Sequence, residues 1–128
     1  MRLKVLQILE KQIYLGGSPQ GRNSILEGFE EVAKTSEVPA GAMKIVKVAG
    51  VEVIVANVEG KLYAIANKCT HVGGPLGRGK LVGSVIQCPW HGSKFDVKSG
   101  AVVGGPAQKP EPTFQVEVDD SAVWIKRP

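Results

Sequence analysis

The sequence predicts an all-β domain, built as a sandwich or as a barrel-like stack of short strands. Short runs rich in Val and Ile recur from residue 29 onward, and glycine, proline and paired aspartates separate them. Little of this region repeats its apolar residues at helical spacing. A chain of 128 residues, 43% of them hydrophobic, is long enough to bury the core of one such domain.

The N-terminal part of the chain follows a different pattern. Apolar residues recur at near-helical spacing between Leu3 and Ile13, and the Gly16-Gly17-Ser18-Pro19 stretch would end any helix that they form. We therefore expect residues 1–28 to be an N-terminal extension or arm, and residues 29–128 to be the domain.

Two tight hairpins are expected, with Ala49-Gly50 and Glu59-Gly60 as their turns. Both connections are two residues long and end in glycine, as tight hairpins prefer. The strands that they connect cover residues 43–48, 51–55, 55–58 and 61–65. Asp119-Asp120 is expected to turn the last strand pair. The remaining strands are predicted at residues 84–87, 94–96, 101–103, 114–118 and 122–125.

Both cysteines and both histidines of the chain lie in two short segments, Cys69-Thr70-His71 and Cys88-Pro89-Trp90-His91. Packing gives no reason to place the only two cysteines beside the only two histidines. Two thiolates and two imidazoles, brought together by two loops, make a metal site. Each segment begins where a predicted strand ends, which places the metal at loop tips on a rigid scaffold.

The residues allow three interpretations of this arrangement. A zinc ion accepts two cysteines and two histidines, but zinc sites usually gather a cysteine pair first and a histidine pair later. A [2Fe–2S] cluster with two cysteines on one iron and two histidines on the other suits the alternation seen here. A disulfide between Cys69 and Cys88 is the third interpretation, and it leaves the positions of both histidines unexplained.

The longer stretches CTHVGGPL (69–76) and CPWHGSKFD (88–96) resemble the two cluster-binding boxes of Rieske iron–sulfur proteins. The resemblance covers about residues 29–128. It implies the Rieske fold, in which stacked antiparallel sheets carry two loops that bind a Rieske-type [2Fe–2S] cluster. The ligands that it implies are Cys69 and Cys88 on one iron and His71 and His91 on the other.

Departures from the family pattern narrow the function. Rieske subunits of respiratory cytochrome bc complexes have two further cysteines, joined in a disulfide, at positions that here hold Gly74 and Trp90. The chain therefore resembles the soluble Rieske-type ferredoxins, which implies a one-electron carrier between a reductase and a terminal oxygenase or similar acceptor. The main alternative is the small subunit of a nitrite reductase-type enzyme complex, which this domain also resembles. A zinc-bound structural module is the third class.

The carrier is not expected to be an enzyme itself. A non-haem iron site that activates oxygen uses two histidines and a carboxylate. Both histidines of this chain are already assigned to the cluster. The chain is therefore predicted to be an electron-transfer component of an oxidoreductase system, with no catalytic residues of its own.

Three residues of the second box are expected to tune or cover the cluster. Ser93 matches a position whose hydroxyl donates a hydrogen bond to a bridging sulfide in high-potential relatives. Phe95 stands where those relatives often have a tyrosine that donates to a cysteine sulfur. The chain thus keeps one of the two hydrogen-bond donors and lacks the other. This implies a midpoint potential in the lower part of the Rieske range of about −150 to +300 mV. Trp90 is expected to be a hydrophobic cover.

Positive charge gathers in the region of the two boxes. The whole chain has a net charge of +4, and residues 66–104 hold five basic residues against one acid, Asp96. This distribution suits the steering of an acidic redox partner, with a merely solubilising surface as the alternative. The basic residues expected at such a docking surface are Lys68, Arg78, Lys80, Lys94 and Lys98.

Other partners are not expected. No aromatic residues interleave with the basic ones as a base-stacking platform would require, which argues against nucleic acid. No apolar run approaches the ~20 residues needed to cross a membrane, and the N-terminus has no secretory pattern. We expect a soluble, cytoplasmic protein.

Overall fold

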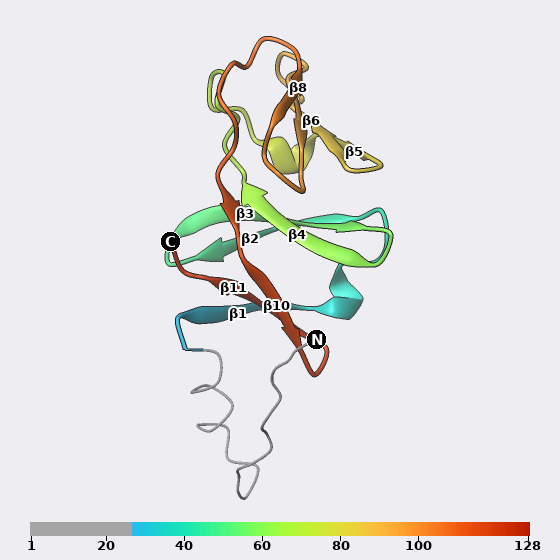
Figure 1. Cartoon of the computed structure of the whole chain (residues 1–128), viewed down its shortest axis with the longest axis vertical. Coiled ribbons are helices and arrows are strands. Elements are labelled where there is room, and N and C mark those ends of the chain that lie inside the picture. The colour runs from blue at the N-terminus through green and yellow to red at the C-terminus, as the bar shows by residue number, and fades with distance from the viewer. Residues whose placement is uncertain (1–26) are drawn as a thin grey trace, which may run out of the picture.

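The computed structural model describes residues 27–128, which form three antiparallel sheets that follow one another along the vertical axis of Figure 1. The first sheet has the strand order β1-β11-β10, the second β2-β3-β4-β9, and the third β5-β6-β7-β8. The predicted all-β class and the stacked antiparallel sheets are confirmed. The first sheet consists of β1 (Phe29–Lys34), β10 (Val116–Asp119) and β11 (Ala122–Lys126).

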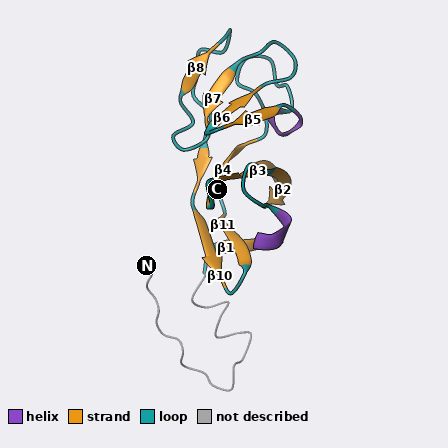
Figure 2. Ribbon diagram, turned by 90° about the vertical axis from the view of Figure 1, so that its right-hand side faces the viewer, coloured by secondary structure: helices purple, strands orange, loops and turns teal. Residues whose placement is uncertain are grey.

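The second sheet adds a late strand to three consecutive ones, whereas the third is built of four consecutive strands (Figure 2). The second sheet consists of β2 (Met43–Val48), β3 (Val51–Val58), β4 (Lys61–Ala66) and β9 (Thr113–Phe114). The third consists of β5 (Lys80–Val82), β6 (Val85–Gln87), β7 (Lys94–Asp96) and β8 (Val102–Gly104). Two single-turn 3₁₀ helices complete the described part, η2 (Thr35–Glu37) and η3 (Leu76–Arg78).

Two-residue turns close the hairpins of the second sheet, as predicted. Ala49 and Gly50 have φ angles of 51° and 81°, and Glu59 and Gly60 have 55° and 93°. Positive φ at both central residues is the geometry of a type I′ turn, whose twist matches that of the flanking strands. The glycine in each pair makes this conformation inexpensive, because it has no Cβ.

The end of the chain differs from the prediction in two ways. The strand predicted at 114–118 is divided, because β9 pairs with β4 in the second sheet whereas β10 pairs with β11 in the first. The chain changes sheets at Gln115, which belongs to neither strand. The last turn lies at Asp120 and Ser121, with φ angles of 55° and 70°, one residue later than expected.

Strand β3 is buried on both faces and joins two hydrophobic cores. Ile54, Ala56 and Val58 pack in the core that also contains both cysteines, which we call the site core. Val53 and Val55 pack in the second core, between the first two sheets. Successive side chains of a strand point to opposite faces, so neighbours in the sequence enter different cores. Each valine or isoleucine fully buried in this way contributes roughly 1.5–3 kcal/mol of hydrophobic stabilisation.

The expected N-terminal arm lies outside the described residues except for Glu27 and Gly28. The first and fifth strands, β1 and β5, were not predicted as separate strands. No helix within residues 27–128 is long and apolar enough to span a membrane.

Candidate metal centre

The first ligand loop, residues 69–74, follows β4 and is closed by its own backbone. The amide of Cys69 donates to the carbonyl of Gly74 at 2.8 Å, and the amide of Gly73 donates to the carbonyl of Cys69 at 2.8 Å. Gly73 has a φ of 83°, which only glycine adopts readily. This tight turn buries Cys69 and leaves His71 exposed.

The second ligand loop, residues 88–93, repeats the same construction after β6. The amide of Cys88 donates to the carbonyl of Ser93 at 2.7 Å, and the amide of Gly92 donates to the carbonyl of Cys88 at 3.1 Å. Gly92 has a φ of 81°. Cys88 is therefore buried and His91 exposed, as in the first loop. In both loops the fourth residue after the cysteine is a glycine, which is the local sequence signal for this turn.

Asn67 anchors the first loop, a role that the sequence analysis missed. Its side chain is buried and donates to a carboxylate oxygen of Glu52 at 3.0 Å. Its side-chain oxygen accepts the amide of Gly77 at 2.7 Å, and its backbone carbonyl accepts the amide of Leu76 at 2.7 Å. The amide group thus ties both ends of the loop to β3. Only the fold reveals this role, because Asn67 is separated from Glu52 by 14 residues.

The structure brings the four predicted ligands together as two pairs. Cys69 and Cys88 are each 2% exposed and belong to the site core. The rings of His71 and His91 lie outside them, with centroids 5.1 Å apart and planes at 84°. Within residues 27–128, no three Cys, His, Asp or Glu side chains are arranged to share one metal ion. An inner thiol pair and an outer imidazole pair match a cluster of two irons, each with its own ligand pair.

Both cysteines are free thiols, and the surroundings of Cys69 favour its protonated form. Burial raises the pKa of Cys69, and the neighbouring Cys88 thiol adds to this. Hydrogen bonds from the His71 backbone and the Ser93 hydroxyl lower it part of the way back. Metal binding requires thiolates, so a positively charged group must supply the stabilisation that this apolar site lacks.

The three residues expected to tune or cover the cluster lie at different depths. Ser93 is fully buried, and its hydroxyl oxygen accepts the amide of Ala107 at 3.1 Å, which leaves its proton free to donate. Phe95 is fully buried in the site core with both cysteines. Trp90 is 57% exposed on the second loop. The donation by Ser93 to a sulfide and the tuning role of Phe95 stay predictions.

The five basic residues expected at a docking surface are all exposed, but they do not all lie near the histidines. Lys68 lines a hollow together with His71. Lys80 and Lys94 flank Gln87, the residue before Cys88, on the neighbouring strands. Arg78 lies in η3, after the first loop.

Lys98 is the exception among these basic residues. It lies in the turn after β7, at the other end of that strand from the second loop, and borders a separate hollow with Tyr63 and Phe114. Although Lys98 is close to the second loop in the sequence, it does not lie at the tip of that loop.

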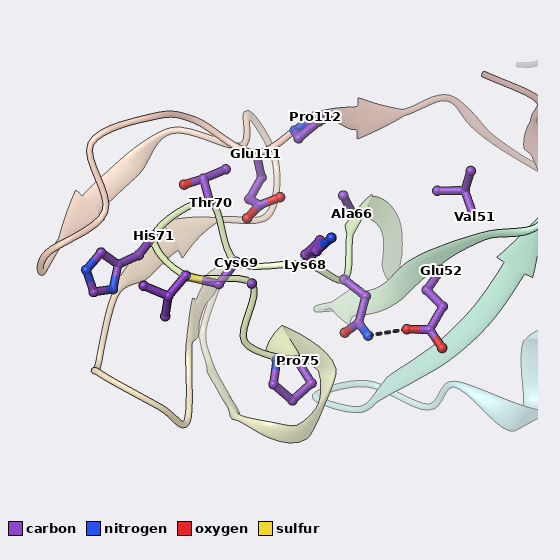
Figure 3. A pocket seen from close by; sticks show the side chains of 13 residues that line it. Val51, Glu52, Ala66, Lys68, Cys69, Thr70, His71, Pro75, Glu111 and Pro112 are labelled. Carbon is purple, nitrogen blue, oxygen red and sulfur yellow. Dashed lines mark hydrogen bonds between the residues drawn. The ribbon is translucent and has the colours of Figure 1, made fainter.

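The hollow beside His71 has a volume of about 820 Å³ and is shown in Figure 3. Glu111 lines it and is only 3% exposed. Among the described residues, neither of its carboxylate oxygens has a hydrogen-bond partner. Burial raises the pKa of Glu111 to about 7, and the nearby Thr70 backbone offsets this only in part. Nothing in the amino-acid sequence points to this buried group, since a glutamate between two prolines is typical of an exposed loop.

Comparison with known proteins identifies the family. The Rieske [2Fe-2S] domain matches residues 28–117. The ferredoxin component of naphthalene 1,2-dioxygenase/salicylate 5-hydroxylase systems from Ralstonia sp is 35% identical over 100 residues, which are 78% of this chain and 96% of the relative.

Solved structures agree with this assignment. The ferredoxin of carbazole 1,9a-dioxygenase from Nocardioides aromaticivorans IC177 has a TM-score of 0.77 and 30% identity, over 80% of this chain and 100% of that chain. A chain in a complex of reduced oxygenase and oxidized ferredoxin in carbazole 1,9a-dioxygenase has a TM-score of 0.74 and 32% identity, over 78% of this chain and 94% of that chain. The chain belongs to the Rieske [2Fe–2S] domain family, among its ferredoxins, and this membership implies a Rieske-type cluster at the two loops.

Proposed function

We propose that Cys69 and Cys88 bind one iron of the cluster, that His71 and His91 bind the other, and that the chain carries single electrons to a terminal oxygenase. The observation that carries this proposal is the pair of exposed imidazoles, 5.1 Å apart, on the same two loops as two buried free thiols. No other set of side chains in the described residues combines these ligand types.

Different parts of the chain have different roles in electron transfer. The cluster, when bound, supplies the one-electron oxidation and reduction. The site core excludes water from the two cysteines. The two glycine turns hold the loops open at the surface, so that the exposed histidines provide the shortest route to a partner. The chain performs no bond-making step of its own and is an electron carrier rather than an enzyme.

The relatives suggest the class of partner. The similar proteins named above are ferredoxin components of aromatic dioxygenase systems, and one solved complex pairs such a ferredoxin with its oxygenase. We extend this to the present chain: a reductase reduces it, and a terminal oxygenase of a ring-hydroxylating system oxidises it. A cytoplasmic location accords with two free cysteines and remains a prediction.

The ligand set is tested by replacing each of the four residues with alanine and assaying iron and acid-labile sulfide under identical conditions. Each variant should lose most of its cluster, because each lacks a bond to iron. Asn57→Ala is a useful control, since Asn57 is also buried but bonds the carbonyl of Val38 in the second core. Equimolar zinc without sulfide in the native protein would overturn the proposal.

The carrier role is tested with a purified reductase and terminal oxygenase of a ring-hydroxylating system. Product should form only when the cluster-loaded chain is added, and a Cys88→Ala chain should not replace it. Tight co-purification with one large catalytic subunit, without turnover in this assay, would instead favour the nitrite reductase-type subunit.

A further inference from the structure

We propose that Trp90 is a positioning residue that braces the two ligand loops by packing its indole ring against the backbone of Gly74. This inference rests on the proposed function, because the loops it braces are those proposed to bind the cluster. Its subject is the outer rim of the site, where one loop meets the other.

The contact is defined by the space around Gly74. A Cβ placed on this buried residue would lie 3.1 Å from Cδ2 and 3.2 Å from Cγ of Trp90. It would also lie 2.8 Å from the sulfur of Cys88. Real Cβ atoms are rarely this close to ring carbons, so the indole packs against Gly74 and leaves no room there for a side chain. Glycine at position 74 is thus required by space rather than by a positive φ.

The two partners of this contact are fixed to the ligands on either side. Gly74 accepts the amide hydrogen bond of Cys69, so a shift of Gly74 moves the first cysteine. Trp90 lies between Cys88 and His91 in the chain. The contact therefore links the first cysteine of one loop to both ligands of the other.

The exposure of Trp90 distinguishes a brace from an ordinary core residue. A tryptophan that is 57% exposed adds little to a hydrophobic core, and neither core includes it. Two ring carbons of Trp90 and the Cys88 sulfur border the same space beside Gly74. Ser93 joins the loops at the buried side through Cys69, and Trp90 joins them at the solvent side.

Removal of the ring has two expected effects. The loops can then move relative to each other, and water gains access to the Cys88 sulfur. Looser loops should broaden the distribution of cluster geometries and speed the loss of iron. Loss of one packed side-chain contact typically changes an equilibrium by roughly two- to tenfold or more, so we expect loss of the cluster to a chelator to be faster by a similar factor.

The test compares four cluster-loaded proteins: native, Trp90→Ala, Trp90→Phe and Val103→Ala. Val103 is a matched control, because it is 52% exposed on β8, in the sheet whose strands β6 and β7 carry the second loop. EPR spectra of the reduced proteins report the spread of cluster geometries, and absorbance during incubation with EDTA reports the rate of loss. Trp90→Ala should give broadened lines and faster loss, Trp90→Phe should restore most of both, and Val103→Ala should match the native protein.

Each other outcome has a definite meaning. Native lines and a native rate of loss in Trp90→Ala would overturn the brace while the proposed function stands. Slower reduction by the partner alone, without either change, would make Trp90 a docking contact and would also overturn it. A native protein without any [2Fe–2S] cluster would overturn the proposed function itself.

A double-mutant cycle provides a second test that does not depend on Trp90→Ala alone. Gly74→Ala places a methyl group against the ring, and it should speed cluster loss more in the native background than in the Trp90→Ala background. The methyl group of Gly74→Ala also approaches the Cys88 sulfur, and this part of its effect on cluster loss is present in both backgrounds. Equal effects in the two backgrounds would show that the ring and Gly74 are not coupled.

Discussion

The hydroxyl of Ser93 lies beside the thiol of Cys69, although the two residues belong to different loops. The Ser93 oxygen is held in place by the amide of Ala107 at 3.1 Å. Since that bond uses the oxygen as acceptor, the hydroxyl proton is available to sulfur. The relationship links three separate segments of the chain at the buried side of the site.

We predict that Ser93→Ala lowers the midpoint potential. A donated hydrogen bond stabilises the more negative, reduced state, and its loss favours the oxidised one. A charge-assisted hydrogen bond is worth roughly 1.5–3 kcal/mol, and ~59 mV corresponds to ~1.4 kcal/mol for one electron. A decrease of several tens of millivolts is therefore expected in a redox titration followed by EPR.

Two observations separate this effect from general damage. Ser93→Ala also leaves the amide of Ala107 without its partner, which should cost about 1–3 kcal/mol of stability. Ser99→Ala is the control, because Ser99 is exposed and its hydroxyl oxygen accepts the amide of Ala101 in a turn. An unchanged potential in Ser93→Ala, with the cluster intact, would rule out the tuning role.

Phe95→Tyr is the converse substitution, and we predict that it raises the potential. Phe95 is fully buried in the core that also contains both cysteines, so a new hydroxyl in the site core must find a sulfur or remain unpaired. A bond to a cysteine sulfur would stabilise the reduced state. The same redox titration measures the shift, and a lower stability without a higher potential would show that the hydroxyl does not reach sulfur.

Glu111 makes stability depend on pH, with a sign that follows from its raised pKa. Its pKa is raised from 4.5 to about 7 on folding. Between these values the folded state holds a proton that the unfolded state has lost. The contribution of Glu111 to the free energy of unfolding is therefore most favourable below pH 4.5. It is lost as the pH rises through about 7 and the buried side chain becomes charged.

We predict that Glu111→Gln stabilises the protein above pH 7. The neutral amide avoids a buried charge, and at ~1.4 kcal/mol per pKa unit the gain is on the order of 3 kcal/mol. The gain should shrink toward acidic pH, where Glu111 is protonated. Thermal denaturation of the cluster-loaded protein across this range measures it, and Glu59→Gln, at an exposed turn, is the control. A gain that is the same at all pH values would contradict the assignment.

The sequence predicted what depends on local chemistry and missed what depends on long-range pairing. The turns at Gly50 and Gly60 were evident because a two-residue turn needs positive φ. The four candidate ligands could be named from the sequence because the chain has no other cysteine or histidine, and their role as ligands stays a prediction. The division of the predicted strand at Gln115 was not evident. The strand-like sequence pattern continues across Gln115, and only the partner strand changes. Asn67 was missed for a similar reason, since its partners belong to other elements.

The last prediction concerns docking, where the structure supplies a control that the sequence could not. Lys80 and Lys94 flank the strand that leads into the second loop, whereas Lys98 and the exposed Lys61 lie elsewhere. Each Lys→Glu change replaces a positive charge by a negative one, so either double reversal lowers the net charge from +4 to zero. Differences between the two double variants therefore report position, not total charge.

We predict that Lys80→Glu with Lys94→Glu slows reduction by the native reductase at low ionic strength, while Lys61→Glu with Lys98→Glu has a much smaller effect. An acidic partner would be drawn toward the exposed histidines by the first pair only. The difference should fade as the Debye length shrinks from ~30 Å at 0.01 M salt to ~8 Å at 0.15 M. Stopped-flow reduction at several salt concentrations measures it, with the midpoint potential unchanged in both variants. Equal slowing by both pairs would mean that only the net charge matters and that the lysines beside the second loop guide no partner.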